Sequence, residues 1–425
     1  MNNGVKTIIY KTLKNGLRLV IEEVPYVRSV SLGVWINVGS RLEKENDSGL
    51  AHFIEHMLFK GTKNRSSKKI SQDIFYYGGD INAFTTHDHT CYHVKMPYNH
   101  IDRGIEVLSD IMLNSIFSKD EIEKEKAVII EEIKMYEDSS EDYVYERLLN
   151  KIYENKGIGK NVLGSIETVN NINRDKIINF FNNFYVPNNS VIVVSGNVDT
   201  DLIIKKIEDA FKNWNRYDFS FNRQKEKFSP VTFIEDRDDE QANLAFIFQS
   251  PDDSVDKDYY SVKLIGNILG TSPSSRLFQH IREEKGLAYS VYSSDNYYTD
   301  HAEFGIYASV ANENILEVYN LILEEIANIS RDYISEDELV FSKEQYKGSV
   351  IMSAEDTSDR MLLIGEYEID NKRVKTMEEI VEIVDSIDMD YIKDVIDRIF
   401  KSPMAVGITG SSAVSAMRSL DREVI

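Results

Sequence analysis

Two histidines and a glutamate in residues 52–56 (HFIEH) have the types and the spacing that a zinc site requires. On a helix, His52 and His56 lie four residues apart, so both imidazoles project from one face about one turn apart. Glu55 follows His52 by three residues and shares that face. A carboxylate beside two imidazole ligands is the arrangement needed for a base next to a zinc-activated water. The alternative is a pair of surface histidines that happen to flank a glutamate.

A catalytic zinc site takes a third protein ligand and leaves one position for water. Residues 118–121 (SKDE) have the form of a capping box, which predicts a helix running to about Tyr136. This helix supplies the acidic candidates Glu121, Glu123, Glu125, Glu131 and Glu132. Glu125 and Glu132 are seven residues apart and share a helical face. Periodicity does not select Glu132 over Glu131, and the pattern taken alone is typical of a solvated charged helix.

A second group of possible ligands is formed by the alternating residues His87, His89, Cys91 and His93. In a strand, all four side chains point to one side. Residues on the same side of one strand are spaced about 6.6–7 Å apart, which is too far for four of them to converge on one ion. We therefore predict a polar strand face here rather than a metal site.

Composition limits the class of protein. The 425 residues include 49 basic and 71 acidic side chains, and the net charge of −22 would repel phosphate backbones, so no nucleic-acid partner is expected. A single cysteine, Cys91, excludes an intramolecular disulfide framework and any site with several cysteine ligands. No apolar run approaches the roughly 18–20 residues of a membrane-spanning helix, and the N-terminal residues lack a signal-peptide core. We expect a soluble cytoplasmic protein with no membrane partner.

The elements that must position these residues recur along the chain. Lys14-Asn15-Gly16 predicts a hairpin turn, and a strand over Val27–Val38 and a helix from about Gly49 follow it. That strand and helix have counterparts 211 positions later, and the strand residues Val191–Gly196 have one 214 positions later. A near-constant offset of about half the chain indicates a duplication.

We therefore predict two similar α+β domains, with an N-terminal zinc-binding domain over 1–214, a linker over 215–230 and a C-terminal repeat over 231–425. At the repeat positions of the two histidines and the intervening glutamate, the second half has Lys263, Gly266 and Asn267. These residues cannot reproduce the ligand set, so one zinc ion per chain is expected.

The segment 49–62 (GLAHFIEHMLFKGT) resembles the inverted-motif zinc peptidases of the insulinase/pitrilysin superfamily, most of all the mitochondrial processing peptidase and its bacterial relatives. The resemblance covers essentially the whole chain. It implies two domains with mixed, mostly antiparallel sheets and helices packed on one face. In that family a glutamate 76 residues after the second histidine is the third ligand, and a glutamate seven residues earlier supports the site. These positions are occupied here by Glu132 and Glu125.

The resemblance also implies how a substrate is held. Gly78-Gly79-Asp80 forms a turn before a strand that contains Asn82, Ala83 and Phe84. In the family the matching segment is an exposed sheet edge, where a peptide can pair through its backbone. The alternative is that Asn82 only serves the turn.

Four further residues take their expected roles from the resemblance. The family's C-terminal arginine and tyrosine, which hold substrate and oxyanion, match Arg282 and Tyr289. A guanidinium and a phenol are suitable donors to a developing negative oxygen. The sequence alone would make Arg282 a surface charge and Tyr289 a core residue. Asp142 and Glu146 match positions that contact substrate arginine in processing-peptidase relatives, although their acidic surroundings alone predict a solvated surface.

The resulting prediction is a zinc endopeptidase that cleaves peptides or unfolded polypeptide segments in a closed chamber, with His52, His56 and Glu132 as metal ligands and Glu55 as general base. The alternatives are a non-catalytic peptide-binding or assembly subunit of the same fold and a different metal-dependent hydrolase. Longer relatives enclose their substrate between two halves that each resemble this chain. We therefore expect a homodimer whose sites are completed across the interface. The alternative that the sequence leaves is a heterodimer with a related subunit.

Overall fold

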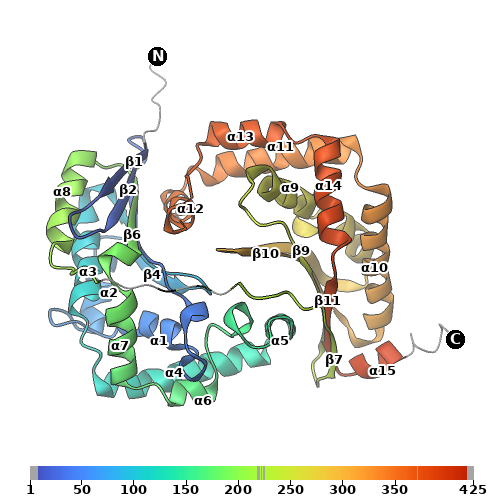
Figure 1. Ribbon diagram of the computed structural model, residues 1–425, viewed down its shortest axis with the longest axis horizontal. Coiled ribbons are helices and arrows are strands. Elements are labelled where there is room, and N and C mark those ends of the chain that lie inside the picture. Colours follow the sequence, from blue (N-terminus) through green and yellow to red (C-terminus); the bar gives the residue numbers. More distant parts are fainter. Residues whose placement is uncertain (1–7, 218–220, 222, 224, 371, 419–425) are drawn as a thin grey trace. The chain divides into compact units, whose positions relative to one another are not determined.

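The computed structural model describes residues 8–217, 221, 223, 225–370 and 372–418 (Figure 1). These residues form two compact units, each built on one mixed β-sheet. The first unit takes its described residues from Met1–Ile133, Lys160–Gln224 and Met352–Val374. The second unit takes them from Lys134–Gly159, Lys225–Ile351 and Lys375–Ile425. Part of the predicted linker 215–230 lies outside the described residues.

The first unit contains a six-stranded sheet in the order β1-β2-β6-β3-β5-β4. Its strands are β1 (Ile8–Thr12), β2 (Arg18–Glu23), β3 (Ser29–Ile36), β4 (Asp80–Thr85), β5 (Thr90–Pro97) and β6 (Ser190–Gly196). β2 and β6 run parallel, whereas the other neighbouring strands run antiparallel. The predicted hairpin joins β1 to β2 through a turn in which Gly16 has a φ of +90°, a conformation that glycine adopts without strain.

Helices cover both faces of this first sheet rather than the one face expected, because the helix over residues 357–369 comes from the second repeat and packs on the other side. On one face, Leu32 of β3 and Ile54 of α1 belong to the larger hydrophobic core. On the other face, Trp35 packs with Met361 of α12, and a Cβ atom on Gly365 of α12 would lie 2.1 Å from the indole ring. The helices that run wholly or largely in this unit are α1 (Leu50–Leu58), α2 (Ser67–Phe75), α3 (Ile101–Asn114), α4 (Lys119–Asp138), α6 (Ile166–Asn170), α7 (Arg174–Phe184), α8 (Thr200–Phe211) and α12 (Thr357–Ile369).

The second unit contains a five-stranded sheet in the order β7-β11-β8-β10-β9, which matches β2-β6-β3-β5-β4 of the first sheet strand for strand. The first pair in each series is parallel and the others are antiparallel. The strands are β7 (Thr232–Asp236), β8 (Gln241–Gln249), β9 (Ala288–Tyr298), β10 (His301–Ala311) and β11 (Met404–Gly410). The prediction of two similar α+β domains is confirmed.

The helices of the second unit include two short stretches of π-helix, Asn267–Thr271 and Phe278–Glu284. The α-helices are α5 (Ser140–Ile152), α9 (Asp256–Gly266), α10 (Ile315–Asp332), α11 (Glu336–Ser353), α13 (Met377–Asp385), α14 (Met389–Phe400) and α15 (Ala413–Arg418). No π-helix occurs among the described residues of the first unit. The two repeats therefore share their sheet but differ in the helical segments that follow β3 and β8.

Each unit includes one helix from the other repeat. α5 follows directly after α4 in the chain but packs on β8 and β11 of the second sheet, where Val144 and Leu148 join Ile247 in one core. α12 follows α11 but packs on β3 and β6 of the first sheet. The predicted boundaries at 1–214 and 231–425 give the order of the repeats along the chain, whereas the compact units interleave them.

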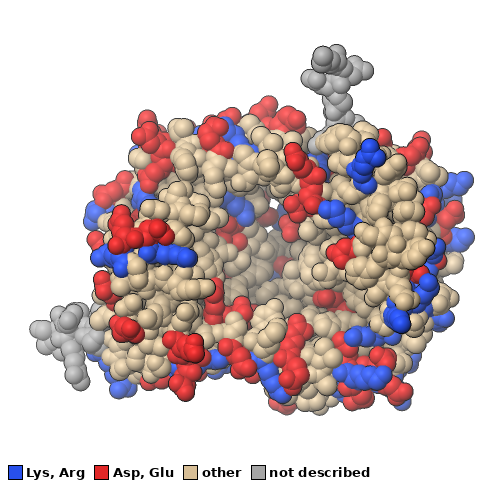
Figure 2. All heavy atoms as spheres, turned by 180° about the vertical axis from the view of Figure 1, so that it is seen from behind, with Lys and Arg blue, Asp and Glu red and all other residues tan. Residues whose placement is uncertain are grey.

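Acidic side chains lie over much of the face shown in Figure 2, with lysine and arginine side chains between them. This distribution accompanies a net charge of −22 for the whole sequence. Among the described residues, no helix combines the length and the apolar character needed to cross a membrane.

Candidate metal centre

Helix α1, which carries His52 and His56, is fixed at its N-terminus. The backbone N–H groups of Gly49 and Ala51 donate to the Glu43 carboxylate at 2.8 and 2.6 Å, so two donors of the first turn are satisfied. Burial raises the pKa of Glu43 to about 8, and these two hydrogen bonds oppose that rise. Gly49 has a φ of +88°, which favours glycine at this position.

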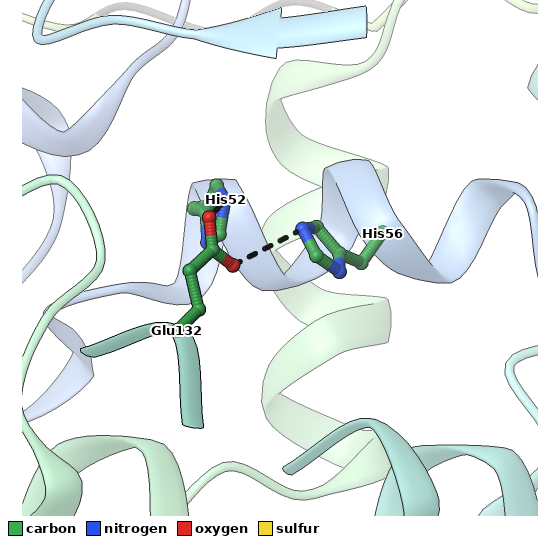
Figure 3. Close-up of side chains that lie close together, drawn as sticks. All are labelled: His52, His56 and Glu132. Carbon is green, nitrogen blue, oxygen red and sulfur yellow. Dashed lines mark ion pairs between the residues drawn. The ribbon is translucent and has the colours of Figure 1, made fainter. Parts of the chain in front are cut away.

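Glu132 of α4 lies opposite the two histidines of α1 (Figure 3). Its two carboxylate oxygens lie 3.9 Å from His52 Nε2 and 3.7 Å from His56 Nε2. One ligand atom from each of the three residues lies within 4.8 Å of the other two. Within the described part of the chain, this is the group of His, Cys, Asp and Glu side chains that converges closely enough to hold a metal ion.

The donor set fits zinc. Two imidazole nitrogens and one carboxylate oxygen are ligands that Zn²⁺ accepts, and three protein ligands leave one position of a tetrahedral site open. Burial, and then the neighbouring His56, lower the pKa of His52 to about 3. The His52 imidazole is therefore neutral at physiological pH, which is the form that binds a metal.

Glu125 and Lys60 form a hydrogen-bonded chain behind His56. The buried Glu125 carboxylate accepts from His56 Nδ1 at 2.8 Å through one oxygen and from Lys60 Nζ at 2.6 Å through the other. Burial would raise the pKa of Glu125, but the hydrogen bonds from His56 and Lys60 outweigh it and lower that pKa. Because Nδ1 of His56 carries the donated proton, its Nε2 lone pair is free to face a metal.

The pKa of His56 responds to the same groups. Burial lowers the pKa of His56, but the hydrogen bond with Glu125 and the negative charges of Glu55, Glu125 and Glu132 outweigh burial and raise it. Metal binding must therefore displace a proton from this imidazole over part of the pH range, which makes metal affinity depend on pH.

Glu55 lies on the same helix with only 9% of its surface exposed. Thr85, the last residue of β4, donates its hydroxyl to Glu55 Oε2 at 2.6 Å. Burial raises the pKa of Glu55, and the Thr85 hydrogen bond opposes that rise. A carboxylate whose pKa is raised toward neutrality is better suited to accept and return a proton during a reaction.

The predicted substrate-binding residues Asn82, Ala83 and Phe84 lie on β4, which is the edge strand of the first sheet. The Asn82 side-chain oxygen accepts from the N–H of Ala83 at 2.9 Å. The Phe84 ring packs edge-on against Trp35, with 5.5 Å between ring centroids. The Phe84 side chain therefore contributes to the core beneath α12, and backbone groups and Asn82 remain as the contacts that β4 offers a peptide.

Four predicted residues belong to the second unit and are described within it. Arg282 lies in the π-helix Phe278–Glu284, with its guanidinium 4.9 Å from the centroid of the Phe278 ring. Tyr289 on β9 is 71% exposed, so it is no core residue.

Asp142 and Glu146 lie one turn apart on α5. Asp142 accepts from the Ser139 hydroxyl at 2.6 Å as part of the N-terminal cap of the helix. Burial, and then the charge of Asp142, raise the pKa of Glu146 to about 7. Glu146 is therefore partly protonated at neutral pH.

At the repeat positions of the helix that carries His52 and His56, the second unit has an ion pair. Lys263 of α9 lies 2.6 Å from Asp295 of β9, and its ammonium group lies 5.2 and 5.4 Å from the ring centroids of Tyr259 and Tyr297. Gly266 ends α9, and Asn267 begins the π-helix.

The predicted strand face around Cys91 is wrong for two of its four residues. β5 begins at Thr90, and a turn closed by the hydrogen bond from Thr86 N to His89 O precedes it. His89 packs edge-on against Trp35, with 5.7 Å between centroids, and His87 Nε2 lies 3.1 Å from a backbone oxygen. The alternation of ligand types continued through a turn that contains no glycine or proline to mark it.

Lys60 and Thr85 were not predicted from the sequence. Lys60 lies two residues beyond the end of α1 at Leu58, so its four-residue spacing from His56 is not a helical spacing and gives no signal for this contact. Thr85 follows Phe84, and strand alternation places its side chain on the same face as Ala83. Neither residue type by itself indicates catalysis.

Comparisons with known proteins identify the family of this chain. A family model described as Insulinase (Peptidase family M16) matches residues 18–165, and one described as Peptidase M16 inactive domain matches residues 171–346. The uncharacterized zinc protease YmxG of Bacillus subtilis is 36% identical over 401 residues, covering 94% of this chain and 98% of that protein. An uncharacterized zinc protease of Rickettsia felis is 34% identical over 404 residues, covering 94% and 96%.

Solved structures show the same fold. A protease from Helicobacter pylori has a TM-score of 0.89 at 23% identity, covering 95% of this chain and 100% of that chain. A structure described as a putative M16-like peptidase from Alicyclobacillus acidocaldarius has a TM-score of 0.82 at 18% identity, covering 95% and 98%. At these identities the likeness is one of fold.

Proposed function

Because the chain belongs to the insulinase family, peptidase family M16, we propose that it is a zinc-dependent endopeptidase that cleaves peptides or unfolded polypeptide segments. The observation that carries this proposal is the convergence of His52, His56 and Glu132 beside the nearly buried carboxylate of Glu55. The naming of relatives as zinc proteases supports it.

A bound zinc ion would polarise the scissile carbonyl and acidify a water molecule. Glu55 accepts a proton from the water as it attacks the carbonyl carbon, and then donates that proton to the leaving amine nitrogen. Glu125 accepts a hydrogen bond from the Nδ1–H of His56. The Nε2 atom of the same ring therefore keeps its orientation toward the other two proposed ligands, His52 and Glu132. Arg282 and Tyr289 are proposed to donate hydrogen bonds to the oxyanion.

Substrate is proposed to pair with the edge of β4 through backbone hydrogen bonds along Asn82, Ala83 and Phe84. Such pairing is compatible with many peptide sequences, because the backbone hydrogen bonds do not depend on which side chains the peptide carries. Asp142 and Glu146 are proposed to favour basic residues near the cleaved bond, a preference that salt weakens. The pKa of Glu146, raised to about 7 by burial, makes that preference stronger above neutral pH than below it.

A homodimer is proposed to close the chamber, with each site completed by the partner. Both the metal-binding set and the pair Arg282 and Tyr289 are present in one chain, which supports self-association over a division of labour between two different subunits. Mixing inactive Glu55→Gln and inactive Tyr289→Phe proteins with subunit exchange tests this. Partial recovery of activity is expected. If activity does not recover although exchange is demonstrated, then either both sets of residues act within one chain or Arg282 and Tyr289 take no part in the reaction.

One zinc ion per chain and a cytoplasmic location complete the proposal. The first rests on Lys263, Gly266 and Asn267 at the second repeat's equivalent positions, and the second on the single, buried Cys91.

The endopeptidase proposal is tested by metal removal. Purified protein is stripped with a chelator, reloaded with Zn²⁺ and incubated with several unrelated peptides, and the products are identified by mass spectrometry. Internal cleavage that disappears on chelation and returns with zinc is expected. A zinc-loaded protein that binds peptides but cleaves none would favour the non-catalytic alternative.

A further inference from the structure

Thr85 joins the strand proposed to hold substrate to the residue proposed to act as base. It is the last residue of β4 and pairs with Thr90 of β5 across the hairpin. Side chains on a strand alternate, so Thr85 shares a face with Ala83 and Ile81. Both of those residues pack against the core that contains the buried residues of α1. The Thr85 side chain is thereby directed toward the helix that carries Glu55.

The contact between Thr85 and Glu55 has a defined direction. An ionised carboxylate can only accept, so the Thr85 hydroxyl is the donor in the 2.6 Å hydrogen bond to Glu55 Oε2. A hydrogen bond to a charged acceptor is short and about twice as strong as one between neutral groups. It engages one carboxylate oxygen and leaves Oε1 for a proton transfer. With 9% of Glu55 exposed, little water competes for that oxygen.

We propose that Thr85 is a positioning residue that fixes the orientation of Glu55 and couples it to the peptide-pairing strand β4, an inference that rests on the proposed endopeptidase function. A peptide that adds to the edge of β4 immobilises the strand on its open side. The same strand holds the hydroxyl that aims the base. Substrate pairing and alignment of the base are therefore linked through one side chain.

This role affects turnover more than binding. Peptide pairing with β4 uses backbone groups, which a change of the Thr85 side chain leaves in place. Without the hydroxyl, Glu55 samples other rotamers, and fewer bound substrates meet a correctly oriented carboxylate. A lower kcat with little change in KM is the expected signature.

The experiment compares Thr85→Val, which keeps the shape but removes the donor, with Thr85→Ser, which keeps the donor. We expect Thr85→Val to lower kcat by about 10–100-fold, the range for losing a hydrogen bond to a charged group. KM should stay within about twofold, zinc content should equal that of the wild type, and Thr85→Ser should recover most of the loss.

Thr90→Val is the matched control, because Thr90 is the cross-strand partner of Thr85 and its buried hydroxyl donates to the Val38 carbonyl at 2.9 Å. Thr90 also has a side-chain hydrogen bond with Tyr185. The substitution removes these hydroxyl hydrogen bonds from the same hairpin without touching Glu55, so it should lower thermal stability but not kcat. If the wild type is active and Thr85→Val has an unchanged kcat, the inference about Thr85 is overturned and the proposed function is not. An equal loss in Thr90→Val, or a loss explained by missing zinc, overturns the inference in the same way. A wild type that cleaves no peptide refutes the proposed function and this inference together.

Discussion

Five strands have the same order in the two sheets, yet the helices that follow β3 and β8 differ in how their polar residues are paired. In the first unit, α1 presents His52 and His56 to Glu132, with ligand atoms within 4.8 Å of one another. In the second unit, α9 presents Lys263, which is neutralised by Asp295 at 2.6 Å. The same strand framework occurs in both units, and a few side chains at matching positions form a group of possible metal ligands in one unit and an ion pair in the other.

The polar groups of the two units also differ in how burial affects their charged forms. Burial lowers the pKa of His52 to about 3 and raises that of Glu55, so the first unit keeps polar groups in an environment that disfavours their charged forms. Such groups commonly reduce stability at sites kept for function. In the second unit, Lys263 has a carboxylate and two aromatic rings beside it. We therefore expect substitutions of His52, Glu55 and Glu132 to change chemistry, and substitutions of Lys263 and Asp295 at the matching place in the second unit to change stability.

The largest expected effect is loss of metal from the first unit. Glu132→Gln should lose most of its zinc, because a neutral amide oxygen is a poorer zinc ligand than a carboxylate. Glu131→Gln, one position earlier on α4, is the matched control and should retain about one zinc ion per chain. Metal analysis after dialysis measures both. An empty Glu131→Gln protein beside a loaded Glu132→Gln protein would exchange the two assignments.

A buried carboxylate in the second unit should affect stability instead. Glu303 of β10 accepts a hydrogen bond from Tyr153, and burial raises its pKa from 4.5 to about 7 although tyrosine hydroxyls oppose the rise. Between those values the folded state binds more protons than the unfolded state, so stability falls as pH rises through this window. The fall should amount to about 3 kcal/mol at most.

Glu303→Gln isolates this contribution, because it cannot titrate. Its free energy of unfolding, measured by denaturant at pH values from 4.5 to 8, should fall less steeply with rising pH than that of the wild type. Parallel curves for the two proteins would show that Glu303 does not gain a proton on folding.

Behind the proposed metal ligands, Lys60→Met should weaken zinc binding by about 10–100-fold, the range for groups that orient a ligand. The Glu125 carboxylate would lose the 2.6 Å partner that holds its second oxygen. Lys60→Arg should retain most of the affinity, and the exposed Lys63→Met should have no effect. Competition with a chromogenic chelator gives the affinities. Equal affinities for Lys60→Met and Lys63→Met would exclude Lys60 from the centre.

The smallest expected effect lies at the equivalent position of the second unit. Lys263→Met should destabilise the protein by about 1 kcal/mol, because Asp295 loses its partner in a partly exposed ion pair. Zinc content should not change. Lys263→Met combined with Asp295→Asn should recover part of the loss in a double-mutant cycle. Zinc loss in Lys263→Met would contradict the separation of roles between the two repeats.

The local part of the site could be predicted from the sequence. His52, Glu55 and His56 lie within one helical turn, so their common face follows from the geometry of a single helix. The choice of Glu132 over Glu131 required the family resemblance, because helical periodicity alone leaves neighbouring residues undecided. The repeat could also be recognised from the sequence, because the order and spacing of the strands and helices are kept where residue identity is low.

Contacts between distant segments could not be predicted in this way. α5 and α12 have ordinary helical patterns, and nothing in those patterns says which of two similar sheets each helix covers. Nothing in the sequence around Gly365 indicates its close approach to Trp35. Thr85 was missed because its role depends on where the end of β4 meets α1, and a threonine in a strand is favoured by propensity alone.

One comparison tests whether Glu55 acts as a base beside a metal held by the first unit. Zinc content and peptide cleavage are measured on the same preparations of wild type and Glu55→Gln. We predict about one zinc ion per chain in both proteins and a rate at least about 10²-fold lower in the variant, as expected for loss of a general base. Turnover near the wild-type rate by zinc-loaded Glu55→Gln would contradict the role of Glu55 as a base.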